Sequence, residues 1–279
     1  MTRQVLLTAL LLALGSRAAA EPVLYVADHE VKKVLKIKFD GTLLWDYPND
    51  NGHDVQVLPN KNVLLNRSKV VQEVTPEKKV VWEYRGVSPE AVQRLPNGNT
   101  LVADNGRMNV VEVDREGRVL WEYRVANNNK RPTPTMRMVR RLDNGNTLIC
   151  ASTEDAVLEI DPAGKIVWKY DVPFPYLATR LPGGNTLISS GSGYGSPVGH
   201  FVIEVDKDGK TVWKYGGADA PEDQKLNWPS GHVRLPNGNT LIAVARDGVI
   251  REVTPEKKTV RTIRSPAMKH PATIVVVDE

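Results

Sequence analysis

Short runs of apolar residues, rather than long helical periods, organise most of the chain. From residue 23 onward these runs last four to six positions, are rich in Val, Ile, Leu, Tyr and Trp, and are bounded by Gly, Pro, Asn and Asp. Such runs are typical of β-strands, and no window keeps the 3.6-residue period of an amphipathic helix. The pattern predicts an all-β protein.

One phrase recurs along the chain. In residues 94–124 it is RLPNGNTLVADNGRMNVVEVDREGRVLWEYR, and its turn returns as LPNKN at 58, LDNGN at 142, LPGGN at 181 and LPNGN at 235. The closing tryptophan of successive copies is Trp45, Trp82, Trp121, Trp168 and Trp213, with Arg261 in that place in a sixth copy. The intervals of 37, 39, 47, 45 and 48 residues match the length of a propeller blade.

The repeat predicts a six-bladed β-propeller of four-stranded antiparallel blades. In the third blade, strands are expected near 90–95, 99–104, 109–114 and 118–124. Gly accepts the left-handed conformation that closes the LPNGN hairpin, and Lys61 in its place is expected to introduce strain. The tryptophans are expected to pack between blades.

The chain ends predict how the ring closes. Residues 23–48 supply the second, third and fourth strands of a blade, whereas HPATIVVVDE near the C-terminus matches a first strand alone. Pairing residues 272–278 with residues 23–28 completes the sixth blade and removes exposed sheet edges.

The first twenty residues do not fit the repeat. Arg3 precedes the apolar run VLLTALLLALG, and Ala18-Ala19-Ala20 offers small residues for a peptidase. We predict a signal peptide over 1–20, cleaved near Ala20, a propeller over 21–279, and a secreted or periplasmic protein. An N-terminal membrane anchor is the alternative, although the run is short for a transmembrane segment and none is expected later in the chain.

Charge gives little information about partners. The chain has 37 basic and 33 acidic residues, and loss of Arg3 and Arg17 with the signal would leave a net charge of +2. We therefore expect no nucleic-acid partner. We also expect a monomer. The single Cys150 lies in the apolar run TLICA, so we expect a buried, inert thiol.

The variable loops favour one face for function. In a blade built as a meander, both tight turns lie on one face, and the longer connections lie on the other. The three insertions, at 125–135, 191–200 and 216–230, all fall on this second face, the long-loop face, and include Tyr194 and Trp228 as candidate stacking groups.

Polar residues are expected where the inner strands begin on that face. Aligned on the LPNGN turns, they are His53, Glu90, Arg137, Tyr176 and Ser230, with His232 two places deeper. This ring predicts a site for a polar or anionic ligand, or for proton transfer; a solvated channel without a ligand is the alternative. His53 precedes Arg67 by fourteen residues, as His232 precedes Arg246, so each pair could hold an oxyanion or act in catalysis.

A repeated arginine precedes the turn leucine in four copies. Arg94, Arg141, Arg180 and Arg234 could form a basic collar in the channel, but we favour ties between blades, through backbone carbonyls or acids such as Asp114 and Asp161. Asp28, His29 and Asp104-Asn105 leave open a Ca²⁺ or Zn²⁺ site, although no metal site is predicted.

The copies of LPNGNTL followed by VxEVDxxGxxVWxY resemble the repeats of quinoprotein-like (PQQ-like) β-propellers over essentially the whole chain after residue 20. Six copies, with HDVQVLPNKNVLLNRS at 53–68, are similar to the bacterial arylsulfotransferase group, in which a histidine carries the sulfuryl group and His, Asn and Arg stabilise it. The resemblance implies His53, Asn66 and Arg67, or His232 and Arg246, as candidates. The chain has six predicted blades and no Cys pair, and in both respects it differs from the eight-bladed quinone-dependent dehydrogenases. No PQQ cofactor is therefore expected.

Two classes of function follow from these observations. The first is an exported scaffold that binds a small polar or anionic ligand, or a protein, on its long-loop face through His53, Asn66, Glu90, Arg137, Tyr176, Tyr194, Trp228 and His232. The second is an arylsulfotransferase-like enzyme with a histidine nucleophile. A metal-dependent, lactonase-like hydrolase is a third hypothesis, for which calcium would be the cofactor.

Overall fold

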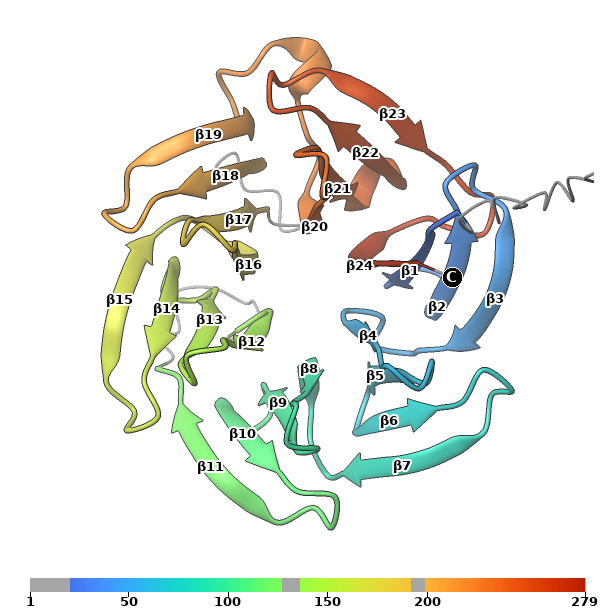
Figure 1. The fold of residues 1–279 in the computed structure, drawn as a ribbon, viewed down its shortest axis with the longest axis vertical. Helices are drawn as coiled ribbons and strands as arrows, with labels where there is room; N and C mark the ends of the chain where they lie inside the picture. Colours follow the sequence, from blue (N-terminus) through green and yellow to red (C-terminus); the bar gives the residue numbers. More distant parts are fainter. Residues whose placement is uncertain (1–20, 127–135, 192–198, 279) are drawn as a thin grey trace, which may run out of the picture.

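The computed structural model describes residues 21–126, 136–191 and 199–278, and these form six antiparallel four-stranded sheets around a central channel (Figure 1). Two 3₁₀ turns, η1 (Glu222–Gln224) and η2 (Ala245–Asp247), are the helical segments of this part of the chain. The predicted six-bladed β-propeller is confirmed. No helix among these residues has the length and apolar character needed to cross a membrane.

Each blade runs outward from the channel. From the innermost strand to the outermost, the strands are β24 (Pro271–Val277), β1 (Val23–Asp28), β2 (Lys33–Lys38) and β3 (Leu43–Pro48) in blade 1; β4 (Val55–Val57), β5 (Val63–Arg67), β6 (Val70–Val74) and β7 (Val80–Arg85) in blade 2; β8 (Pro89–Arg94), β9 (Thr100–Asp104), β10 (Asn109–Val113) and β11 (Val119–Arg124) in blade 3; β12 (Val139–Arg141), β13 (Thr147–Ala151), β14 (Ala156–Ile160) and β15 (Ile166–Asp171) in blade 4; β16 (Pro175–Arg180), β17 (Thr186–Ser190), β18 (Phe201–Val205) and β19 (Thr211–Gly216) in blade 5; and β20 (Pro229–Arg234), β21 (Thr240–Val244), β22 (Val249–Val253) and β23 (Thr259–Ile263) in blade 6. The strands of blade 3 lie within one residue of the sequence prediction.

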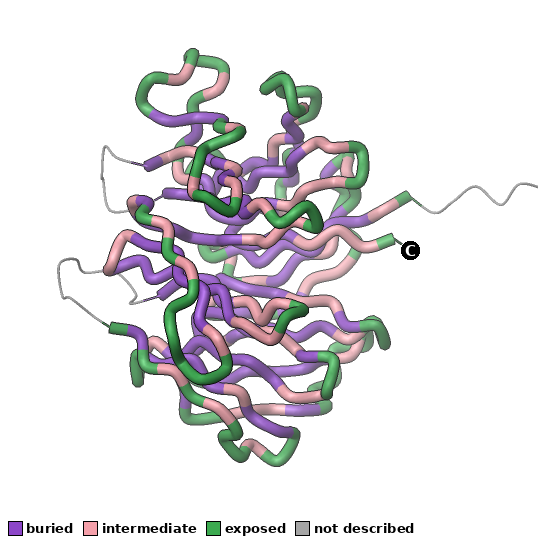
Figure 2. The backbone as a smooth tube through the Cα atoms, turned by 60° about the vertical axis from the view of Figure 1, so that its left-hand side comes forward, coloured by how far each residue is buried: buried purple, intermediate pink, exposed green. Residues whose placement is uncertain are grey.

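Burial follows the order of the strands. The second strands are buried except for the half-buried Arg67 at the end of β5, whereas the outer strands carry mostly exposed or half-buried residues (Figure 2). The apolar clusters lie between neighbouring blades; for example, Leu24 and Ile37 of blade 1 pack with Leu241 and Ile250 of blade 6. The fold therefore has several inter-blade cores in place of one central core. Cys150 belongs to one of them, and burial raises the pKa of its thiol.

The hairpin turns have the predicted conformation. Gly98 of the LPNGN turn in blade 3 has φ +88°, and Lys61 at the same place in blade 2 has φ +65°. The left-handed conformation costs a side-chain-bearing residue about 1–2 kcal/mol. Lys61 thus carries the strain expected from the sequence.

The repeated tryptophan and arginine join neighbouring blades at four of the six junctions. Trp82 of blade 2 donates its indole N–H to the carbonyl of Arg115 in blade 3, at 2.8 Å. Arg94 of blade 3 lies 4.5 Å above the Trp82 ring and forms an ion pair with Glu73 of blade 2, at 2.9 Å. The same three-residue contact recurs at three other junctions, formed by Arg141, Trp121 and Glu112, by Arg180, Trp168 and Glu159, and by Arg234, Trp213 and Glu204.

These contacts confirm the structural interpretation of both residue types. The expected acid partners were wrong, because glutamates of the third strands bind the arginines. Asp114 instead accepts backbone N–H groups within its own turn, from Glu116 and Arg118, and Asp161 does so from Lys165. A short carboxylate next to a turn reaches the local backbone more easily than the neighbouring blade.

The C-terminal strand closes the ring as predicted. β24 pairs with β1 in antiparallel register, from Val23 opposite Val277 to Asp28 opposite Pro271. The buried carboxylate of Asp28 accepts the backbone N–H groups of Lys269 and His270, at 2.7 and 2.8 Å. The two ends of the chain therefore form one blade.

Candidate functional site

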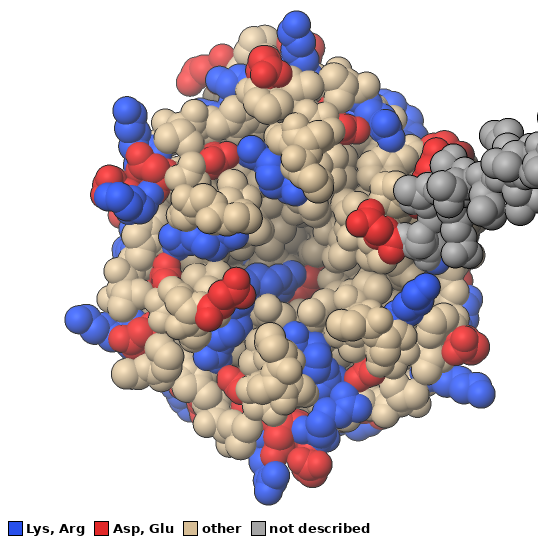
Figure 3. All heavy atoms as spheres, viewed as in Figure 1, with Lys and Arg blue, Asp and Glu red and all other residues tan. Residues whose placement is uncertain are grey.

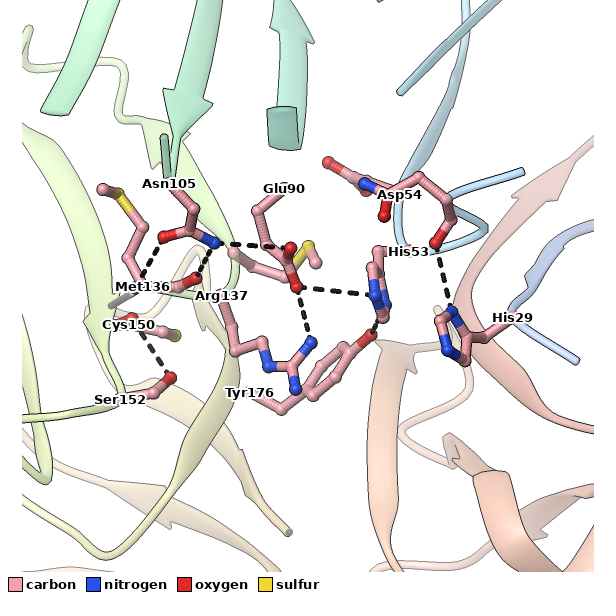
Figure 4. A network of polar contacts seen from close by, with 12 residues as sticks. His29, His53, Asp54, Glu90, Asn105, Met136, Arg137, Cys150, Ser152 and Tyr176 are labelled. Carbon is pink, nitrogen blue, oxygen red and sulfur yellow. Dashed lines mark hydrogen bonds and ion pairs between the residues drawn. The ribbon is translucent and has the colours of Figure 1, made fainter. Parts of the chain in front are cut away.

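Residues from four blades meet in the channel near the long-loop face (Figure 4). His53, Glu90, Arg137 and Tyr176 each stand five positions before the leucine of a hairpin turn, so they occupy one level of the ring. All four side chains are buried. The structure thus brings together four of the predicted ligand-binding residues; Ser230 at the fifth position instead donates its hydroxyl to the carbonyl of Pro271.

Hydrogen bonds and a longer polar contact link these residues across the channel. His53 Nδ1 lies 3.1 Å from the Tyr176 hydroxyl, and His53 Nε2 lies 3.7 Å from Glu90 Oε1. Glu90 Oε1 also receives a 2.5 Å contact from Arg137 Nη1, and Asn105 Nδ2 donates to Glu90 Oε2 at 3.3 Å. We call His53, Glu90, Asn105, Arg137 and Tyr176 the upper network.

Burial determines the charge states of the upper network. Burial lowers the pKa of His53 well below its usual value, and Arg137, His29 and His270 add to this effect. Burial also raises the pKa of Glu90 despite the opposing charge of Arg137, and it raises the pKa of the Tyr176 hydroxyl. A neutral imidazole therefore lies between a protonated phenol and an ion-paired carboxyl group.

A row of rings continues from the upper network toward the long-loop face. The exposed His29 stacks on His53 with ring centroids 4.5 Å apart, and it contacts His270 at 5.9 Å. Trp228 meets His270 edge-on at 4.8 Å, and Arg246 lies 5.9 Å from the Trp228 ring. Arg246 is thus placed beside Trp228 and His270.

A cavity opens at the opposite end of the channel from the upper network, on the face that carries the hairpin turns (Figure 3). It has a volume of about 540 Å³, and we call it the hairpin-end cavity. Arg140, Arg180, Arg234 and His232 contribute its basic side chains, and no Asp or Glu of the described residues lines it. Leu177, Val233 and Ile274 belong to its apolar wall.

His232 is fixed between two hydroxyl groups at this cavity. Its Nδ1 lies 2.7 Å from Ser189 Oγ and its Nε2 lies 3.1 Å from Thr179 Oγ1. Thr179 lines the cavity whereas Ser189 does not, so Nε2 is the ring nitrogen on the cavity side. Burial, with Arg234 and Arg140 nearby, lowers the pKa of His232 to about 3.

Contacts across the channel separate the cavity from the upper network. Arg140 of blade 4 forms two hydrogen bonds with Asp54 of blade 2, from Nη1 at 2.9 Å and Nη2 at 2.8 Å. Thr273 of β24 donates its hydroxyl to the carbonyl of His53, at 2.7 Å. Together with the contact between His53 and Tyr176, these bonds link blades 1, 2, 4 and 5 in the middle of the ring.

Protonation of His232 is expected to destabilise the fold in acid. Its pKa is about 3 in the folded state and about 6.5 in an unfolded chain, so the unfolded state binds more protons between these values. Stability contributed by the neutral imidazole is therefore present above pH 6.5 and is lost as the pH falls. At pH 5 the loss is about 2 kcal/mol for this group.

Urea denaturation at a series of pH values measures this effect. In a His232→Asn variant, which does not titrate, the slope of unfolding free energy against pH between 6 and 4 should be smaller by about 1.4 kcal/mol per pH unit. An unchanged slope would contradict the assignment. His29→Asn is the matched control, because His29 is exposed.

The other predicted residues have different surroundings. Arg67 does not contact His53; its Nε donates to Asp50 Oδ1 at 3.0 Å. Asn66 is buried and joins blades 2 and 3, since it accepts the N–H of Asp54 and donates to the carbonyls of Pro89 and Glu90. Tyr194 lies outside the described residues. The preference for the long-loop face stays a prediction.

Sequence reasoning missed Asp54 and Arg140. Arg140 is adjacent to the repeated Arg141, and Asp54 is adjacent to His53. Successive residues of a strand point to opposite faces of the sheet, so Arg140 lies on the other face of β12 from the inter-blade Arg141. That alternation was the available signal for Arg140.

The possible metal ligands have other partners. Asp28 binds the backbone at the ring closure, and Asp104 Oδ1 accepts the N–H groups of Ser88 and Gly106. Among residues 21–126, 136–191 and 199–278, no group of three His, Cys, Asp or Glu side chains is arranged to hold a metal ion. The calcium-dependent hydrolase stays an untested hypothesis.

Comparison with known protein families gives one match over most of the chain. The sequence model of the arylsulfotransferase (ASST) family matches residues 40–220, which is more than half of the chain. The chain belongs to the arylsulfotransferase family. In this arylsulfotransferase-family protein the matched segment contains the upper network and Arg140, whereas His232 and Arg246 lie beyond it. No significant match exists among curated protein sequences.

Solved structures share the fold of this arylsulfotransferase-family protein. A protein of unknown function from Bacteroides caccae is 22% identical with a TM-score of 0.77, covering 93% of this chain and 100% of its own. Virginiamycin B lyase from Staphylococcus aureus, crystallised with quinupristin, is 13% identical with a TM-score of 0.62, covering 95% and 94%. A chain of the nidogen/laminin complex is 11% identical with a TM-score of 0.66, covering 91% and 98%. At these identities the likeness shows the fold alone.

Proposed function

We propose that this protein binds a small organic anion of the aryl sulfate class in the hairpin-end cavity. The observation that supports this most directly is the lining of the cavity, where three arginines and His232 occur without a carboxylate among the described residues. Arginine N–H groups bind sulfate, phosphate or carboxylate oxygens through charge-assisted hydrogen bonds. The apolar wall of Leu177, Val233 and Ile274 would accommodate the body of the ligand.

The cavity fits such a ligand better than the upper network does. At the upper network, the Glu90 carboxyl group lies 3.7 Å from His53 Nε2, so a sulfuryl group on that nitrogen would meet a carboxylate. A like charge at this distance is repulsive in a buried site. The hairpin-end cavity avoids this repulsion.

Titration calorimetry with 4-nitrophenyl sulfate tests the binding proposal. We expect saturable binding to the purified protein, and affinity that falls as salt concentration rises, because surface-accessible charges are screened. The control ligand is 4-nitrophenol near pH 5.5, where it is uncharged; it has the same ring without the sulfate and should bind at least about tenfold more weakly. Equal affinity for the two ligands, or no binding of the sulfate ester, would contradict the proposal.

Sulfuryl transfer through His232 is a second candidate function. It is favoured by the neutral imidazole, whose Nε2 is held on the cavity side by Thr179 while Ser189 binds Nδ1. The Nε2 lone pair would attack the sulfur of an aryl sulfate, forming an N–S bond while the S–O bond to the aryl group breaks and the phenolate leaves. The oxygen of a phenol would then attack the sulfur, forming a new S–O bond while the N–S bond breaks and its electron pair returns to Nε2 of His232. The phenol loses its proton to solvent, which leaves the new sulfate ester and a neutral imidazole.

Release of 4-nitrophenolate in the presence of phenol measures this transfer. His232→Asn should reduce turnover by at least about a thousandfold, as loss of a nucleophile does in other enzymes. His53→Asn, which alters the upper network, should retain turnover. The opposite result would assign the reaction to His53 and contradict the role of His232.

A further inference from the structure

The arginines of the innermost strands are of two kinds. Arg94, Arg141, Arg180 and Arg234 form the inter-blade contacts described above, and the Nε atom of each is buried without a hydrogen-bond partner in the described part of the chain. Each guanidinium lies over a tryptophan ring and is bound by a glutamate of the preceding blade. The tryptophan and glutamate contacts of these four arginines therefore join neighbouring blades.

Arg140 is placed differently. Its Nη1 donates to Asp54 Oδ2 and to the carbonyl of Val139, at 2.9 and 2.8 Å, and its Nη2 donates to Asp54 Oδ1 at 2.8 Å. A guanidinium has five N–H groups, so these three bonds leave the Nε–H and the second Nη2–H. Both belong to the same edge of the group.

Solvent reaches part of this arginine. The Arg140 side chain is 24% exposed, whereas the carboxylate of Asp54 is fully buried behind it. Arg140 lines the hairpin-end cavity and also the adjoining cavity of about 530 Å³. Arg140 therefore contributes to the walls of both cavities, and two N–H groups on one edge of its guanidinium are not used by the bonds to Asp54 and Val139.

Asp54 itself is held in place by the backbone. Its Oδ1 accepts the N–H of Val55 at 3.0 Å, and its Oδ2 accepts the N–H of Val92 in blade 3 at 2.9 Å. Its own N–H is bound by Asn66 Oδ1 at 2.8 Å. A carboxylate fixed by two blades, with two bonds to one guanidinium, determines the orientation of that guanidinium.

We propose that Arg140 is the oxyanion-binding arginine of the hairpin-end cavity, and that Asp54 is its positioning residue, presenting the Nε and Nη2 edge to two oxygens of a sulfate ester. This inference rests on the proposed binding function. It predicts preference for anions with two adjacent oxygens over monatomic anions of the same charge, because two parallel N–H groups match the former.

Competition against bound 4-nitrophenyl sulfate tests this preference. Methyl sulfate and iodide both carry one negative charge, and the ratio of their inhibition constants measures selectivity for oxygen geometry. In the unaltered protein methyl sulfate should compete at least about tenfold more strongly. Arg140→Lys should bring the ratio close to one, because lysine keeps the positive charge but lacks the two parallel N–H groups of the guanidinium. Asp54→Asn should do the same, because it loosens the orientation of the Arg140 guanidinium.

Matched variants separate this role from a structural one. Arg94→Lys removes the planar guanidinium of an arginine that joins blades but does not line the hairpin-end cavity, and it should leave the ratio unchanged. A purely electrostatic role of Asp54 would instead change the affinities for both anions by the same factor, which would overturn the proposal. Near-ultraviolet circular dichroism shows whether Asp54→Asn folds. If it does not fold, Arg140→Lys still tests the proposal.

The outcomes also distinguish this inference from the proposed function. If the unaltered protein does not bind 4-nitrophenyl sulfate, both are wrong. If it binds the ester but the ratio is unchanged in Arg140→Lys, the assignment of Arg140 and Asp54 is wrong and the binding function stands.

Discussion

Removing the last ten residues, 270–279, is expected to unfold the whole propeller. The deletion removes all of β24 and leaves β1 with an open edge at the channel. Loss of the buried Ile274 alone would cost about 2–5 kcal/mol. Asp28 also loses a backbone partner, so the total approaches the roughly 5–15 kcal/mol stability of a typical domain.

Thermal denaturation followed by circular dichroism measures this effect. The truncated chain should show no cooperative transition, or aggregate on expression. A chain that ends at Val277 keeps β24 and is the control; its melting temperature should match that of the full chain. A cooperative transition at the normal temperature in the longer deletion would show that closure by β24 is dispensable.

Replacing Arg137 with methionine is expected to destabilise the fold by about 3–5 kcal/mol. The change leaves the buried Glu90 carboxyl group without the partner that lies 2.5 Å away. Burial already raises the pKa of Glu90, and removal of Arg137 would raise it further. A carboxyl group whose pKa is raised in the folded state stabilises it below the unfolded pKa of about 4.3 and loses that contribution as pH rises. The loss of unfolding free energy in Arg137→Met should therefore be larger at pH 8 than at pH 5.

A double-mutant cycle in urea identifies the cause. Glu90→Gln combined with Arg137→Met removes both charges and should be less destabilising than Arg137→Met alone. Arg85→Met, which breaks an exposed pair with Glu83, is the control and should change the unfolding free energy by at most about 1 kcal/mol. Equal effects of the buried and exposed changes would mean that Arg137 contributes only packing.

The fold could be predicted from the sequence because its signals are local and repeated. The spacing of the tryptophans gives the blade length, and the LPNGN turns place each hairpin within one residue. Inter-blade packing by Trp82 and its equivalents followed from the same repetition. The acid partners of the arginines were misassigned, because Asp114 and Asp161 bind the backbone of their own turns, whereas glutamates of the third strands, such as Glu73, bind the arginines.

The candidate site could be predicted only in part. Counting back from each turn correctly placed His53, Glu90, Arg137 and Tyr176 at one level of the channel, since every inner strand enters with the same register. The expected pairing of His53 with Arg67 did not form, because Asp50 lies closer to that arginine. His232 was identified, but its cavity on the hairpin face was not.

The sequence by itself determined the number of blades, their strands and the strand that closes the ring, since each depends on contacts within one repeat or on a missing strand. The tertiary structure decided which side chains share the channel. His53 and Tyr176 are separated by 123 positions, and Asp54 and Arg140 by 86. Such contacts depend on the curvature of the closed ring and on side-chain burial, and no interval along the chain encodes either.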